Sequence, residues 1–290
     1  MKAPFIRICL TTMLVATTTL LFAGKPKPDK DLYEGITKGN IEVVKKAIDA
    51  GADVNKKYSM KWPLLWALET SHDTAIIRLL IAKGADVNAN DVKGSVLSQY
   101  GGFVETPQNK AQWLMDFYKK YKVDTVVDPN RYSSITSVVN VLLDAGANPN
   151  YDMGSIIGTP LTGCISFGIG SEEARAEFVK ALCTHPVNRA DFNERMKTAE
   201  SVSANSQGFK LVDKEKHPTP LMYAIQKGYT KIAIALIEAG ADVNITMNTY
   251  HTSADLWATY NNKNTITALD IARQKKNTEV EQKLIEKGAK

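Results

Sequence analysis

Few side chains in this 290-residue sequence have the type and spacing that catalysis or metal binding requires. The four histidines, His72, His185, His217 and His251, are widely scattered along the chain. The sequence contains none of the patterns H-E-x-x-H, G-x-S-x-G, G-x-x-x-x-G-K-[ST] or C-x-x-C. His185 and His217 lie at the boundaries of repeated segments, where a structural hydrogen bond is the usual role. We therefore predict that the chain is not an enzyme and that it holds no metal or other cofactor.

Two cysteines, Cys164 and Cys183, follow the N-terminal apolar segment, and an even pair permits a disulfide in an oxidising compartment. Cys164 falls early in one expected helix and Cys183 late in the next. Antiparallel helices bring these ends together, so Cα atoms within about 7 Å of each other are allowed. A disulfide and a pair of buried thiols are both compatible with the sequence.

An internal repeat organises the rest of the chain. A glycine turn, AGADVN at 50–55, recurs as KGADVN at 83–88, AGANPN at 145–150 and AGADVN at 239–244, with a truncated EKGAK at 286–290. Gly51 and Gly84 are 33 residues apart. A second motif precedes these turns, as WPLLWA at 62–67, TPLTGC at 159–164, TPLMYA at 219–224 and TALDIA at 267–272.

These motifs resemble the ankyrin repeat, which has a period of about 33 residues and the marker T-P-L-H-x-A. The segment 217–244, HPTPLMYAIQKGYTKIAIALIEAGADVN, fits the family pattern without a gap. The resemblance covers essentially everything after residue 29. It implies a stack of short helix pairs with projecting β-hairpins, called fingers below, and a role in binding another protein.

The residue types of this segment are those that two short helices need. Thr219 can cap the first helix, and Pro220 follows at the first helical position, where its missing N–H costs nothing. Gly228 and Gly240 end the two helices. Each helix carries an apolar stripe, so a pair has two apolar sides and must stack on its neighbours. The predicted fold is an all-α solenoid of about six helix–turn–helix repeats with β-hairpin fingers and long inserted loops.

The predicted domain organisation is a signal peptide at 1–23, a linker at 24–29 and an ankyrin-repeat domain at 30–290. Its repeats are predicted at about 30–55, 62–88, 95–150, 159–193, 219–244 and 267–290. The fourth repeat has LCTHPVNRADFN in place of the usual glycine turn.

Insertions in a solenoid fall in loops, often on the binding face. One insertion separates the helices of the third repeat and contains a predicted helix from Thr106 to Tyr121, whose aromatic side either packs on the stack or inserts into a partner. Two others, 194–216 and 245–265, lie at fingers and either pack on each other or bind a partner. Trp and Tyr are favoured interface anchors. We therefore predict that finger residues bind the partner: Tyr58, Met60, Tyr151, Met153, Tyr250, His251, Trp257 and Tyr260.

The first residues resemble a secretory signal. Lys2 and Arg7 precede an uncharged apolar run, Ile8 to Phe22, and the small residues Ala23 and Gly24 follow it. The run is short for a membrane span, which needs roughly 20 residues, although an uncleaved anchor is the alternative. We predict cleavage near Ala23 and a periplasmic or secreted protein, with no membrane insertion after cleavage. The chain has a net charge of +5, and its lysines and arginines are interspersed with acidic residues. This pattern excludes the basic surface that a nucleic-acid partner needs.

A chain that carries a signal and repeats is predicted to act by binding, as a monomer, to another exported protein. It resembles exported bacterial ankyrin-repeat proteins of the immunity or self-protection kind. That resemblance implies that the partner is a secreted or periplasmic hydrolase of peptidoglycan or lipid, which the repeats occlude. The alternatives are an envelope scaffold that does not inhibit its partner and a secreted effector directed at host proteins.

Overall fold

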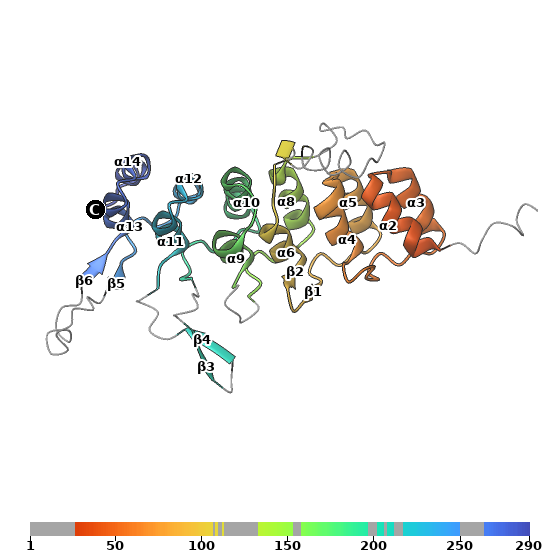
Figure 1. Cartoon of the computed structure of the whole chain (residues 1–290), viewed down its shortest axis with the longest axis horizontal. Helices are drawn as coiled ribbons and strands as arrows, with labels where there is room; N and C mark the ends of the chain where they lie inside the picture. Colours follow the sequence, from red (N-terminus) through yellow and green to blue (C-terminus); the bar gives the residue numbers. More distant parts are fainter. Residues whose placement is uncertain are drawn as a thin grey trace, which may run out of the picture.

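A computed structural model describes residues 27–106, 108–109, 112, 133–152, 158–196, 202–205, 208–211, 217–249 and 264–290. These residues form six consecutive helix pairs, arranged as a row in which each pair stacks on the next (Figure 1). The first helices of the pairs are α2 (Pro28–Lys38), α4 (Pro63–Trp66) with its π-helical continuation η1 (Ala67–Ser71), α6 (Val96–Gly102), α9 (Pro160–Phe167), α11 (Pro220–Lys227) and α13 (Ala268–Gln274). The second helices are α3 (Ile41–Asp49), α5 (Thr74–Ala82), α8 (Ile135–Asp144), α10 (Glu172–Thr184), α12 (Thr230–Ala239) and α14 (Thr278–Glu286). The predicted solenoid is confirmed.

Within the described residues, three antiparallel hairpins project from the side of the row opposite the second helices (Figure 1). They are β1 (Asn90–Asp91) with β2 (Gly94–Ser95), β3 (Val202–Asn205) with β4 (Gly208–Leu211), and β5 (Met247–Thr249) with β6 (Asn264–Ile266). The predicted β-hairpin fingers are therefore present. The signal peptide 1–23, its cleavage site and most of the helix predicted from Thr106 to Tyr121 lie outside the described residues.

The helices begin and end at the residues that the sequence indicated. The Thr219 hydroxyl accepts a hydrogen bond from the backbone N–H of Met222 at the start of α11, and Pro220 follows it in the first turn. Gly228 and Gly240 end α11 and α12 with φ angles of 77° and 96°, in the left-handed region that favours glycine. The first helix starts earlier than expected, since α2 begins at Pro28, within the predicted linker 24–29.

An asparagine at the end of each glycine turn joins one repeat to the next. The Asn55 side chain donates to the Gly84 carbonyl at 2.8 Å and accepts from the Asp86 N–H at 2.8 Å. Asn244 makes the equivalent pair of bonds with Gly288 and Lys290. The Asn244-Ile-Thr sequence would be a glycosylation acceptor, but this side chain is engaged in holding the last two repeats together.

Helix α10 binds both of its neighbours through carboxylates. Glu177 accepts from the N–H and hydroxyl of Thr136 at the start of α8, at 2.9 and 3.0 Å. Glu172 accepts from the Lys231 N–H at 2.6 Å, at the start of α12. Negative charge is favourable at a helix N-terminus, so the fourth repeat stabilises the second helices on either side of it.

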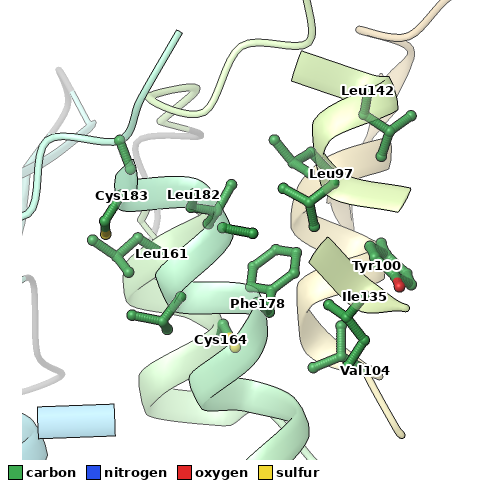
Figure 2. Close-up of a cluster of buried hydrophobic side chains, with 14 of the residues drawn as sticks. Leu97, Tyr100, Val104, Ile135, Leu142, Leu161, Cys164, Phe178, Leu182 and Cys183 are labelled. Carbon is green, nitrogen blue, oxygen red and sulfur yellow. The ribbon is translucent and has the colours of Figure 1, made fainter. Parts of the chain in front are cut away.

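The apolar core runs along the whole row as one contiguous set of buried side chains. At the seam between the third and fourth repeats, the fully buried Phe178 of α10 packs edge-on against Tyr100 of α6, with ring centroids 5.8 Å apart (Figure 2). Since neither repeat can bury these faces alone, the seams hold the fold together. Within the described residues, no helix is long and apolar enough to span a bilayer.

The two cysteines are free and buried in this structure, so the disulfide permitted by the sequence does not form there. Figure 2 shows Cys183 at the level of Leu161 and Cys164 at the level of Phe178. Leu161 and Cys164 are one helical turn apart on α9, which places the two sulfurs at different heights between the helices. The interpretation as two buried thiols is the one that the structure supports.

We predict that both thiols are unreactive while the chain is folded. Burial raises the pKa of Cys164 and of Cys183 to about 12, so at pH 8 only about one thiol in 10,000 is a thiolate. Alkylation by iodoacetamide should be slower in the native protein than in guanidinium chloride by roughly 100-fold or more, as measured by mass spectrometry of the two peptides. Recovery of a linked Cys164–Cys183 peptide before reduction would contradict the structure.

Candidate protein-binding surface

The finger that follows α3 presents one exposed apolar side chain on a tight turn. Tyr58 and Lys61 exchange two backbone hydrogen bonds, of 2.9 and 3.1 Å, across the two residues between them. Those residues, Ser59 and Met60, have φ angles of 49° and 68°. Such turns are usually made by Asn and Gly, because other side chains are strained in the left-handed region. The turn carries Met60 out of the protein, with 81% of its surface exposed.

Aromatic packing holds this finger in place. The Tyr58 ring stacks on Tyr33 of α2 with centroids 4.5 Å apart, and Tyr33 meets the edge of Trp66 at 4.7 Å. The Trp66 indole N–H donates to the Tyr58 carbonyl at 3.0 Å. Tyr58, predicted to bind the partner, is thus half-buried and packs inside the first two repeats, whereas Met60 is free to contact another molecule.

A lysine connects this finger to the next one. The Lys57 ammonium lies 3.8 Å from the centroid of the Trp62 ring and 2.9 Å from a carboxylate oxygen of Asp91, in β1. Burial acts to raise the pKa of Asp91 and is the largest single effect, but the hydrogen bonds from Lys57 and from the Lys93 N–H, with the charges of both lysines, together lower it. The ring and the carboxylate fix the lysine from two sides, so the first two fingers form one preorganised edge.

Sequence reasoning did not single out the aromatic side chains of the first helices. Trp66 and Tyr223 are the fifth residues of WPLLWA and TPLMYA, and both are half-buried. Phe103 and Phe167 lie four residues after the corresponding positions of the third and fourth repeats and are exposed. The spacing of the repeated motifs could have identified these aromatic side chains, because equivalent positions of stacked repeats lie on one face.

A cavity of about 430 Å³ is lined by the ends of the first helices of the third and fourth repeats and by Lys61 and Glu69 of the second repeat. The described residues that line it are Lys61, Glu69, Phe103, Val104, Glu105, Ile169 and Gly170, and this set is called the α6–α9 groove below. Phe103 and Ile169 are 61% and 75% exposed. The Ile169 N–H donates to the Gly102 carbonyl at 3.1 Å, so the two loops that form the groove are joined directly.

The other predicted binding residues are only partly placed. Tyr151 is half-buried, and its N–H lies 3.5 Å from the Asn148 carbonyl oxygen. The remaining ones lie outside the described residues: Met153, Tyr250, His251, Trp257 and Tyr260. The structure thus describes only Tyr58, Met60 and Tyr151 of the eight predicted residues, and their joint role in binding stays a prediction.

The ring of the buried His185 acts as a structural group, whereas the contact of His217 with Arg195 is made by its backbone carbonyl. His185 accepts from the Asn188 N–H at 3.0 Å, and its other ring nitrogen lies 3.2 Å from Asp144. The His217 carbonyl accepts from Arg195 at 2.6 Å. His185 thus fixes the turn that replaces the glycine turn in the fourth repeat. Over the described ranges, no three His, Cys, Asp or Glu residues are grouped closely enough to bind a metal ion.

Comparisons with known proteins agree with this geometry. The sequence model of the family described as Ankyrin repeat matches residues 61–92 and 218–248. The chain is 32% identical to human mitochondrial disaggregase over 85 residues, which is 29% of this chain and 12% of that protein. The bovine protein is 31% identical over 93 residues, 31% of this chain and 14% of the relative. The chain therefore spans only a small part of the length of these relatives.

One solved structure resembles most of the row of repeats. The crystal structure of the ankyrin repeat domain of Bcl-3, of the IkappaB protein family, aligns with 90% of this chain and 86% of its own length, at a TM-score of 0.50 and 17% identity. An ankyrin repeat domain from Acinetobacter baumannii covers 89% of this chain and 98% of its own, at a TM-score of 0.47 and 19% identity. At 17% identity, the likeness to the first of these concerns the fold alone.

Proposed function

Because this chain is an ankyrin-repeat protein by fold, we propose that it binds an exported hydrolase of peptidoglycan or lipid and occludes its active site. The general role, binding another protein, is the one that ankyrin repeats mediate. The observation that carries the proposal is the preorganised first finger, which holds Met60 81% exposed on a turn of two left-handed residues. Strained backbone of this kind is kept where the surrounding structure fixes it, often at binding sites.

One sequence feature and one resemblance support the choice of an exported partner. The N-terminal segment has the charge, apolar run and small residues of a secretory signal, which leads us to propose a periplasmic or secreted location. Bacterial ankyrin-repeat proteins of this design resemble immunity proteins, which protect the producing cell from a hydrolase. A rigid edge suits occlusion, because little conformational entropy is lost on binding.

The test is inhibition of a captured partner. The purified protein is used to isolate partners from the periplasmic extract of the producing cells, and each partner's peptidoglycan- or phospholipid-hydrolysing activity is measured with and without added protein. We expect stoichiometric inhibition. Met60→Ser should weaken binding by about tenfold, the usual effect of truncating an exposed anchor.

The matched control is Val187→Ser, which removes a 90% exposed apolar side chain from the turn after α10. It should leave the affinity unchanged. A partner that binds and stays fully active would favour the scaffold instead, and protein found only in the culture supernatant would favour the effector. Failure to isolate any exported protein would contradict the proposal.

A further inference from the structure

We propose that the α6–α9 groove is a docking site for an apolar side chain of the protein partner, next to which the partner carries a lysine or arginine. The inference rests on the proposed role in protein binding, and it adds a second contact site with a defined chemistry. Lys61, which follows Met60 and closes the turn of the first finger, also lines the groove, so the groove begins at the base of that finger, while Met60 itself is not among its lining residues.

The walls of the groove are built to stay in place. Beyond the bond from Ile169 to Gly102, the Glu105 carboxylate accepts from the Ser171 N–H at 3.2 Å and from its hydroxyl at 2.9 Å. Gly170 lies against the Val104 carbonyl so closely that a Cβ added to it would be 1.6 Å from the oxygen. These contacts tie together two loops that are 66 residues apart in the sequence. A groove fixed in this way is ready for a ligand without rearrangement.

The groove exposes two large apolar side chains to solvent. Phe103 and Ile169 rank among the most exposed large apolar residues of the described chain, and they come from loops that are already in contact. Concave sites with apolar walls and a few polar groups are typical of ligand pockets, and a volume of about 430 Å³ accommodates a large side chain and its neighbours.

The charge on the walls selects the partner. Within the described residues, Glu105 accepts four hydrogen bonds, all from neutral donors: the Thr106 N–H, the Asn109 amide and the two groups of Ser171. Burial acts to raise the pKa of Glu105, but these bonds together lower it, so the carboxylate is ionised at neutral pH. The second acid of the groove, Glu69, is paired with Lys61.

The described part of the chain therefore supplies no cation for Glu105, and the groove keeps one uncompensated negative charge beside its apolar wall. A cation that arrives with the partner would meet this charge in a partly desolvated site, where it attracts more strongly than in water. This is the reason for assigning a basic residue next to the apolar anchor.

The experiment is a selection of random 12-residue peptides displayed on phage against the immobilised full chain, followed by affinity measurement on synthetic peptides by fluorescence anisotropy. We expect the enriched peptides to combine Leu, Met or an aromatic residue with Lys or Arg within three positions. Phe103→Ser and Ile169→Ser should each weaken their binding by about tenfold or more. Val187→Ser, which truncates a side chain of 90% exposure in the turn after α10, should leave it within about twofold.

Glu105→Gln tests the charge separately. It should weaken the basic peptides by about fivefold and have little effect on versions in which the Lys or Arg is replaced by Ala. Thermal melting followed by circular dichroism shows that each variant is folded. The inference is overturned by a selection without enrichment, by peptides that bind the Phe103 and Ile169 variants as well as wild type, or by an absence of cation preference. These outcomes do not affect the proposed function, which is tested with the native partner and the Met60 variant.

Discussion

Replacing Phe178 with alanine is expected to lower the free energy of unfolding by about 3–5 kcal/mol, the usual cost of removing a buried aromatic side chain. Phe178 is fully buried at the seam between the third and fourth repeats, where its ring packs against Tyr100 (Figure 2). In a solenoid each repeat contacts only its neighbours. The substitution therefore weakens only the interface between the third and fourth repeats. We expect urea unfolding, followed by circular dichroism, to separate into two transitions, with the repeats on either side of the seam unfolding independently.

Gly101 provides an internal control for this prediction. A Cβ at Gly101 would lie 2.6 Å from the Phe178 ring, so Gly101→Ala alone should cost about 1–3 kcal/mol by overpacking. In the Phe178→Ala background the ring is gone and the added methyl group has room. The two changes should therefore be strongly non-additive, and the double variant should be no less stable than Phe178→Ala. Additive costs, or a single unfolding transition of unchanged midpoint, would show that the seam does not depend on this contact.

The parts of the fold that could be predicted from the sequence are those that each repeat determines by itself. Thr219 and Pro220 start a helix, because the Thr219 hydroxyl accepts a hydrogen bond from a free backbone N–H and Pro220 has no N–H to satisfy. Gly240 ends the next helix, because it adopts the left-handed conformation that the helix end requires. The same local pattern recurs along the chain, so the stacking of the pairs followed from their apolar sides. This is why the solenoid and its hairpins were predicted correctly.

The candidate sites depend on contacts that no local pattern contains. Tyr58 was expected to bind a partner because it is an aromatic residue on a finger, yet its ring stacks on Tyr33, which belongs to α2, the first helix of the first repeat. The state of the cysteines was left open, because whether the sulfurs meet depends on how α9 and α10 pack, and both thiols are free and buried in the structure. The α6–α9 groove was not predicted at all, since Glu105 and Ser171 meet only when the third and fourth repeats are stacked.

Gly170→Ala is expected to have the second large effect, about 3 kcal/mol of lost stability and a fall in melting temperature of roughly 5–10 °C. The new Cβ would be 1.6 Å from the Val104 carbonyl oxygen and 2.8 Å from its carbon. Both atoms belong to the backbone, so no side-chain rotation can relieve the clash. The loop after α9 must therefore move away from the loop after α6. This movement would break the hydrogen bond from the Ile169 N–H to the Gly102 carbonyl.

Gly102→Ala is the matched control, because a Cβ at this neighbouring position would meet nothing within 4 Å. It lies at the end of α6 and should change the stability by less than about 1 kcal/mol, in the stabilising direction if alanine favours the last helical turn. The pair of variants separates two explanations for an open groove. If the close approach of Gly170 holds the walls, Gly170→Ala should destabilise the chain and abolish binding of the selected peptides, while Gly102→Ala leaves both intact. If the two variants behave alike, the walls owe their position to the rest of the seam, and glycine at position 170 has no part in shaping the site.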